Sequence, residues 1–464
     1  MKKLKINKMK KLFLFLSAAL LVLAACQPKL QEPEGPVEPL KRMPAVKDVA
    51  MYQVNPRVFA PEKSLLAVAD RIDSIADLGV NVVWVMPIYP IGIEKGKNSP
   101  YCIRDYKAIA PEFGTLDDFK HLARVCHEHG MAIILDWVAN HTAWDHPWVK
   151  EHPDWYTHDE KADTIIHPRP WDWYDVADLN YDNKEMRAAM IDAMKYWIQD
   201  VGIDGFRCDV ADGVPADFWK EAIDTLRATA AQQVVDDSTG VKRQILMLAE
   251  GKRADNFTAG FDMNYGWDFK DQLIKVFREG APASSLFDTD KAEYDSLPEG
   301  KVKLRFTTNH DESTKETPPV LFNSLRGSMA AWVAAVFLHG GALVYGSQEV
   351  GYPEPINFFK YVPVDWTANS QLYNEYKSLL TLYNASGLVR HGDIKPYPMK
   401  DVLAFERSYD NDRMLVLVNV RDSIVKVPTP QPWLNKVGAN VLSNFSADLR
   451  DSVELHPYNY LIFK

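Results

Sequence analysis

Residues 131–138 read MAIILDWV, and residues 203–210 read IDGFRCDV. Each stretch is short, apolar and rich in β-branched residues, and each has an aspartate near its end. This pattern predicts a strand of a parallel sheet that is buried on both faces and ends in a polar group. Six further stretches are of the same kind: AMYQV (50–54), VNVVWVM (80–86), ILMLAE (245–250), FDMN (261–264), KLRFTTN (303–309) and ALVYG (342–346).

Helix-like segments separate these strands. The segment 115–130 begins with Thr115, a good N-cap, and ends with glycine, as a helix C-terminus often does. Eight strands that alternate with helices predict an α/β fold, a closed (β/α)8 TIM barrel over residues 47–388. Asp136 and Asp209 are 73 residues apart, which exceeds one barrel unit by about 40 residues. We therefore expect a small inserted domain after strand 3, at about residues 142–182.

The two ends of the chain lie outside the predicted barrel. After it, short alternating strands such as VLAFERSY (402–409) and RMLVLVNV (413–420) predict a C-terminal antiparallel β-sandwich over residues 389–464. Before it, residues 1–25 carry six lysines and no acid, followed by a short apolar run, which is typical of an export signal. LAAC, ending at Cys26, resembles a bacterial lipoprotein signal. A plain secretory signal with an incidental cysteine is the alternative.

That resemblance implies cleavage before Cys26 and a lipid attached to this residue. The protein would then be exported and anchored by lipid to a bacterial membrane, on the periplasmic side or at the cell surface. Residues 26–46 are rich in proline and glutamate and predict an extended tether.

The composition excludes several classes of function. The chain has 53 Lys and Arg against 63 Asp and Glu, a net charge of −10, which argues against nucleic acid as a partner. No glycine-rich phosphate loop is present, so phosphoryl transfer is disfavoured. The 13 Trp, 20 Tyr and 20 Phe residues are more than solubility requires, and they suit a core plus some flat apolar surface for a ligand.

Carboxylates recur where the predicted strands end. A single aspartate there is usually a turn or cap residue, but four in succession are hard to explain in this way. In a barrel, these ends converge on one mouth, where like charges shift one another's pKa. An ionised and a protonated carboxyl together are what double-displacement cleavage of a glycoside requires. The four are Asp136, Asp209, Glu250 and Asp311, and Asn140, His141, Arg207 and His310 stand beside them.

The segments around these residues resemble the α-amylase family, glycoside hydrolase family 13. DWVANH (136–141), GFRCD (205–209), the glutamate of LAEG (248–251) and FTTNHD (306–311) look like its four ordered signature segments. VADLN (176–180) is similar to its extra segment at the end of the inserted domain. The resemblance covers roughly residues 50–390.

This resemblance implies a role for each matching position. Asp209 would be the nucleophile, Glu250 the general acid and base, and Asp311 the residue that binds the sugar hydroxyls at the cleavage site. Arg207 would keep Asp209 ionised, and Asp136 would orient Arg207. Three further residues would contact the same sugar: Tyr101, His141 and His310.

The resemblance also implies a substrate and a metal. The substrate would be an α-1,4-glucan derived from starch. An exo-acting α-glucosidase, a neopullulanase-like or cyclomaltodextrinase-like enzyme, a transglycosylase and a non-catalytic glycan-binding lipoprotein are the alternatives. Many family members carry Lys-His where this chain has Asp212 and Gly213. Asn140 and Asp178 match calcium-binding positions, so calcium is a candidate cofactor, with its absence equally open, and no organic cofactor is expected.

Overall fold

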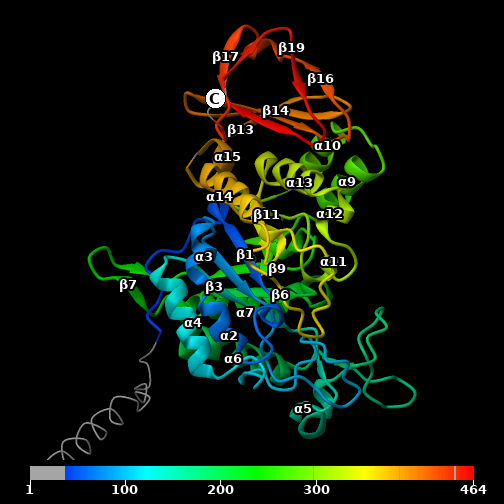
Figure 1. Ribbon diagram of the computed structural model, residues 1–464. Helices are drawn as coiled ribbons and strands as arrows, with labels where there is room; N and C mark the ends of the chain where they lie inside the picture. Colours follow the sequence, from blue (N-terminus) through cyan, green and yellow to red (C-terminus); the bar gives the residue numbers. More distant parts are fainter. Residues whose placement is uncertain (1–36, 296, 386, 444–445) are drawn as a thin grey trace, which may run out of the picture. The chain divides into compact units, whose positions relative to one another are not determined.

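The computed structural model describes residues 37–295, 297–385, 387–443 and 446–464. The predicted signal sequence, Cys26 and the first part of the tether lie outside these residues. Eight parallel strands close into a barrel in the order β1-β12-β11-β10-β9-β6-β3-β2 (Figure 1). This confirms the TIM barrel. Its strands are β1 (Ala50–Val54), β2 (Val82–Val85), β3 (Ala132–Val138), β6 (Gly205–Asp209), β9 (Leu246–Ala249), β10 (Met263–Tyr265), β11 (Val302–Arg305) and β12 (Gly341–Tyr345).

Helices follow the strands along the chain and cover the outside of the barrel. The main ones are α2 (Ser64–Ala69), α3 (Ile72–Asp77), α4 (Leu116–Glu128), α6 (Lys184–Tyr196), α7 (Ala216–Ala230), α9 (Trp267–Arg278), α10 (Ser285–Tyr294), α13 (Leu325–Leu338), α14 (Ser370–Ala385) and α15 (Gly387–His391). Shorter helices are α8 (Asp255–Thr258), α11 (His310–Ser313) and α12 (Pro318–Leu321). Helix α4 begins as predicted, because Thr115 and Asp118 form a reciprocal capping box.

The interior of the barrel changes from apolar to polar along the strands. Met51, Trp84 and Ile134 belong to one buried apolar cluster between the strands. Alternate residues of a strand point to the same side, so the next inward positions are Gln53 and Asp136, which are both fully buried. The barrel therefore has an apolar floor and a polar layer at the carboxyl ends of its strands.

A small inserted region follows β3. It contains β4 (His141–Ala143), α5 (Pro147–Glu151) and β5 (Val176–Asp178), and β4 and β5 pair in antiparallel fashion. His141 stands opposite Asp178 in this pair. The insertion therefore begins at the end of β3, beside the polar layer of the barrel.

The C-terminal region is an antiparallel β-structure, as predicted. Its four-stranded sheet has the order β13-β14-β15-β20, and two two-stranded antiparallel sheets, β16–β19 and β17–β18, accompany it. Leu417 of the four-stranded sheet, Val427 of β16 and Leu449 of β18 share one buried cluster, so the three sheets enclose a core. The strands are β13 (Asp393–Tyr397), β14 (Val402–Tyr409), β15 (Asp412–Asn419), β16 (Val425–Pro428), β17 (Lys436–Ala439), β18 (Ser446–Leu449), β19 (Ser452–Leu455) and β20 (Tyr460–Phe463).

The predicted tether ends earlier than residue 46. Residues 37–46 pack on the barrel, because Val37 and Leu40 are buried and the Glu38 carbonyl lies 2.7 Å from Nδ1 of His127. The burial of these two apolar side chains attaches an otherwise polar segment to the barrel. This segment precedes β1, so it lies at the amino ends of the barrel strands, away from the polar layer.

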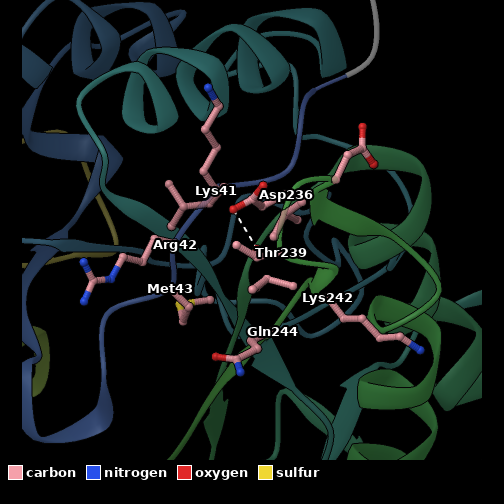
Figure 2. A pocket seen from close by; sticks show the side chains of 11 residues that line it. Lys41, Arg42, Met43, Asp236, Thr239, Lys242 and Gln244 are labelled. Atoms are coloured by element: carbon pink, nitrogen blue, oxygen red, sulfur yellow. Dashed lines mark hydrogen bonds between the residues drawn. The ribbon is translucent and has the colours of Figure 1, made fainter.

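A groove runs beside this segment, as Figure 2 shows. Its other wall is the hairpin of β7 (Val234–Asp236) and β8 (Val241–Lys242), in which Thr239 donates a hydrogen bond to Asp236.

In the ranges that the structure describes, no helix combines the length and the apolar character needed to cross a bilayer.

Candidate active site

The predicted site residues meet at the carboxyl ends of the barrel strands. The parallel register sets Asp136 of β3 beside Arg207 of β6, and Val138 beside Asp209. A pocket of about 400 Å³ opens there. The residues that line it are Lys97, Ser99, Tyr101, His141, Trp173, Asp175, Val176, Asp209, Val210, Glu250, His310, Asp311, Phe358 and Phe359.

The Arg207 guanidinium is the centre of the cluster behind the pocket. Its Nη1 donates to Asp136 Oδ1 and to Asp209 Oδ1, both at 2.8 Å. Its Nη2 lies 3.0 Å from Glu250 Oε1, and its Nε donates to the Tyr265 hydroxyl at 3.1 Å. Because Arg207 is fully buried, one desolvated cation positions three carboxyl groups at once.

Burial and Arg207 act in opposite directions on the pKa values of Asp209 and Asp136. Burial raises the pKa of Asp209 well above its usual value, the neighbouring Glu250 carboxylate raises it further, and Arg207 opposes both effects. Burial likewise raises the pKa of Asp136 to about 6, again against Arg207. Protons shared in such a cluster belong to the whole group rather than to one residue. Burial therefore favours the protonated form of Asp136 and of Asp209, and Arg207 favours the ionised form of both.

A strained backbone links Asp209 to Glu250. Val210, which follows Asp209, has a φ of 42°, a left-handed conformation that β-branched residues rarely adopt. Its amide donates to Glu250 Oε2 at 2.7 Å. Strain of this kind persists where the surrounding structure enforces it, commonly at functional sites. The turn after β6 thus aims a backbone donor at the second carboxyl.

Two histidines face the pocket in neutral form. Burial lowers the pKa of His141 to about 4 and lowers that of His310 well below its usual value. His310 stacks on Tyr101, with ring centroids 5.3 Å apart, and its Nε2 lies 3.2 Å from Asp311 Oδ2. Asp311 keeps 39% of its side-chain surface exposed and faces the open side. These groups offer hydrogen bonds and a flat ring to a polar ligand.

Sequence reasoning missed several residues of the site. Gln53 of β1 lies 2.7 Å from Nδ1 of His310, and Trp84 of β2 donates to Asp136 Oδ2 at 3.1 Å. Both occupy inward strand positions, so the alternation of each strand was the signal that could have found them. Phe358 comes from the long segment after β12, for which the sequence carried no comparable signal.

The structure explains why Asp212 and Gly213 stand where many members of the family that the sequence resembles carry Lys-His. A Cβ on Gly213 would lie 2.7 Å from Asn140 Oδ1 and 3.0 Å from the Trp171 ring, so glycine makes room for both side chains. Trp171 stacks in parallel on Trp173 at 4.7 Å, and Trp173 lines the pocket. Asp212 instead accepts hydrogen bonds from the Lys252 amide and from Asn256, both at 2.9 Å, in the segment after Glu250.

The family comparison identifies the protein class. The model of the family described as "Alpha amylase, catalytic domain" matches residues 63–176 and 155–413. The chain belongs to the α-amylase family. It is a glycoside hydrolase of this family, with relatives named as amylases and cyclomaltodextrinases.

Named relatives of this α-amylase family protein differ in length and in name. The α-amylase MalA of Haloarcula japonica is 28% identical over 403 residues, which are 83% of this chain and 57% of MalA. The chain thus spans little more than half of that relative. The cyclomaltodextrinase of Geobacillus thermopakistaniensis is 24% identical over 475 residues, covering 90% of this chain and 77% of the relative. Among solved structures, the maltogenic α-amylase AmyB of Thermotoga neapolitana has a TM-score of 0.78 and 26% identity, over 90% of this chain and 99% of AmyB.

The residues predicted to bind calcium do not form a complete site. Asn140 precedes β4 and Asp178 ends β5, so the two are close. However, Asn140 Nδ2 bonds His141 Nδ1 at 3.2 Å, and the Asp178 carboxyl, whose pKa is raised by burial, is bonded to Thr157. Within the described ranges, no group of three or more His, Cys, Asp or Glu side chains could hold a metal ion. One carboxylate and one amide fall short of the six to eight oxygens that Ca²⁺ takes.

Proposed function

We propose that this enzyme hydrolyses α-1,4-glucosidic bonds of starch-derived malto-oligosaccharides or polysaccharides with retention of configuration. One observation carries the proposal: Asp209 and Glu250 contact the same buried guanidinium beside a pocket that Asp311 also lines. Two carboxyl groups held this closely suit a retaining mechanism, which needs a separation of about 5–5.5 Å.

In the proposed first step, an Asp209 oxygen attacks the anomeric carbon while Glu250 donates a proton to the glycosidic oxygen. The bond between the anomeric carbon and this oxygen breaks, the shortened glucan leaves as an alcohol, and a β-glycosyl ester forms on Asp209. In the second step, Glu250 removes a proton from water, and the resulting hydroxide displaces Asp209. The first step uses the proton of Glu250 and the free carboxylate of Asp209, and the second step restores both.

The other polar groups would bind the sugar that Asp209 attacks. Asp311 accepts hydrogen bonds from its hydroxyls, His141 and His310 bond it in neutral form, and Tyr101 stacks against it. Arg207 stabilises the Asp209 carboxylate when it leaves the ester. Asp136 holds Arg207 and the Tyr101 hydroxyl, at 2.8 and 3.2 Å, without reaching the substrate.

A cyclomaltodextrinase-like specificity is the second candidate. The aromatic pair of Trp171 and Trp173 beside Gly213 replaces the basic residues that many α-amylases carry there, and a flat indole suits the apolar face of a glucose ring. The names of the Geobacillus and Thermotoga relatives are in keeping with short or cyclic maltodextrins.

Replacing Asp209 with Asn tests the proposal. The variant should still bind maltoheptaose but lose turnover, and proton NMR of the wild-type reaction should show the α-anomer as the first product. Survival of activity in the variant would contradict the nucleophile assignment. Products from maltoheptaose, cyclomaltodextrin, pullulan and isomaltose separate the specificities, since release of glucose alone indicates exo action.

We also propose that the enzyme is exported and anchored to a bacterial membrane by a lipid on Cys26. The support for this location is the sequence around Cys26, which lies outside the described residues. Expressed with labelled palmitate, the full chain should incorporate label and sediment with membranes, whereas the Cys26→Ala variant should do neither. Label in that variant would overturn the lipid anchor.

A further inference from the structure

A chain of hydrogen bonds runs behind the pocket and passes through His310. Gln53 is fully buried, and its Nε2 lies 2.7 Å from Nδ1 of His310. On the other side of the ring, Nε2 of His310 lies 2.7 Å from the Tyr101 hydroxyl and 3.2 Å from Asp311 Oδ2. The Tyr101 hydroxyl in turn donates to Asp136 Oδ2 at 3.2 Å. Four different strand ends and loops supply these groups.

The chemistry of these groups sets the direction of every bond. An amide nitrogen only donates, so Nδ1 of His310 accepts from Gln53, and the single proton of the neutral ring is on Nε2. Tyr101 can then accept from Nε2 and donate its own proton to the ionised Asp136. Each contact pairs one donor with one acceptor.

Exchanging the oxygen and nitrogen of the Gln53 amide would create a conflict in the site. If the Gln53 oxygen faced His310, the ring proton would be on Nδ1, and an Nε2 lone pair would face Asp311 Oδ2 at 3.2 Å. Two acceptors would then face each other beside the buried His310 ring, which is unfavourable. The arrangement with the amide nitrogen toward the ring avoids this conflict, and it leaves the buried Gln53 Oε1 without a hydrogen-bond partner among the described residues.

The position of the ring proton matters because the His310 imidazole is neutral. The ring is 1% exposed, and burial together with the Arg207 cation lowers its pKa well below the usual value. The charged groups around the ring are Arg207 of β6, Glu250 after β9, its neighbour Asp311, and Asp136 through Tyr101. A neutral imidazole has one hydrogen to donate, and its position decides whether it faces the pocket.

We propose that Gln53 is a positioning residue for hydrolysis: it selects the Nε2–H tautomer of His310 and so supplies the pocket with a hydrogen-bond donor. The inference rests on the proposed function, in which His310 bonds the sugar that Asp209 attacks. When substrate enters, Nε2–H turns from Tyr101 or Asp311 to a sugar oxygen, while Gln53 keeps the opposite nitrogen occupied.

The decisive variant is Gln53→Glu. A carboxylate accepts where the amide donates, so it would hold a proton on Nδ1. Nε2 would then donate only in the protonated ring, so the variant should lose more activity at neutral pH than at acid pH. We expect the ratio of kcat/KM at pH 5 to that at pH 7.5 to rise about tenfold over wild type, the worth of one hydrogen bond. A pH profile parallel to that of wild type would overturn the proposal.

Two matched variants separate positioning from structure. Gln53→Met keeps the length of the side chain without hydrogen bonds, and should lower kcat/KM about tenfold with no change in the shape of the pH profile. Asn55→Asp adds a carboxylate just after the end of β1, where the Asn55 side chain accepts from the Arg57 amide. It should leave the profile unchanged. An acid-shifted profile in Asn55→Asp would assign the effect to charge alone.

A spectroscopic measurement tests the tautomer without substrate. In the full chain labelled with ¹⁵N-histidine, and with a His310→Gln variant for assignment, Nε2 of His310 should be protonated and Nδ1 should not. A protonated Nδ1 would overturn the inference. If the wild type cleaved no α-glucan, the proposed function would fail, yet the NMR spectrum would still report which nitrogen carries the proton.

Discussion

Replacing Arg207 with Met should displace the acid limb of the activity profile toward higher pH. Arg207 is the cation that opposes the rise in the pKa of Asp209, which burial and the Glu250 carboxylate cause. A neighbouring arginine typically lowers an aspartate pKa by about 1–3 units. Its removal should therefore raise the pH needed to ionise Asp209 by about 1–3 units, and lower kcat by up to about 10- to 1,000-fold at pH values on the acid limb.

The assay is the pH dependence of kcat/KM on maltoheptaose, measured from pH 4 to 9. The Arg207→Met variant should gain activity with pH, because more Asp209 becomes ionised, over a range in which the wild type is already constant. Arg207→Lys keeps the charge but loses the fork that reaches two carboxylates at 2.8 Å. It should therefore lose activity while its acid limb stays near that of wild type.

A second buried arginine provides the matched control. Arg305 is also fully buried and pairs with Asp290, at 2.7 Å, and with Glu293, but it takes no part in the pocket. Arg305→Met should lower the free energy of unfolding and leave the shape of the activity profile unchanged. If the acid limb of a folded Arg207→Met variant coincides with that of wild type, Arg207 does not control the ionisation of Asp209, and the electrostatic argument fails.

Three further outcomes are expected. His146 is 5% exposed, its Nδ1 accepts from the Trp148 amide, and burial lowers its pKa from about 6.5 to about 3. The unfolded chain therefore binds an extra proton, so the free energy of unfolding falls as the pH drops below 6.5. Between pH 7 and pH 5 this fall should be about 2 kcal/mol smaller in His146→Asn, whose side chain can still cap the helix, as measured by urea unfolding. Trp173→Ala should raise KM for maltoheptaose about tenfold, whereas Trp144→Ala, outside the pocket lining, should not, and equal effects would refute a stacking role. Chelation with EDTA should leave activity and melting temperature unchanged, and a loss restored by Ca²⁺ would reveal ligands beyond Asn140 and Asp178.

Local sequence patterns determined the fold and most of the site. Apolar runs such as MAIILDWV (131–138) are short and rich in β-branched residues, which favours buried strands, and their alternation with helix-like segments predicts a barrel. Because parallel strands bring their carboxyl ends to one mouth, the order of residues along the chain was enough to assign Asp136, Asp209 and Glu250 to one site. The register of β3 and β6 brings two of them to the same guanidinium.

Only the tertiary structure decided how these groups act on one another. That Arg207 contacts three carboxyls, that Val210 adopts a left-handed backbone and that Gln53 meets His310 depend on strands far apart in the chain. The attachment of residues 37–46 to the barrel and the stacking of Trp171 on Trp173 depend equally on distant packing. Sequence patterns report which face of a strand or helix is buried, but charge, protonation and tautomer are set by the neighbours within a few ångströms, and those neighbours are chosen by the closure of the barrel.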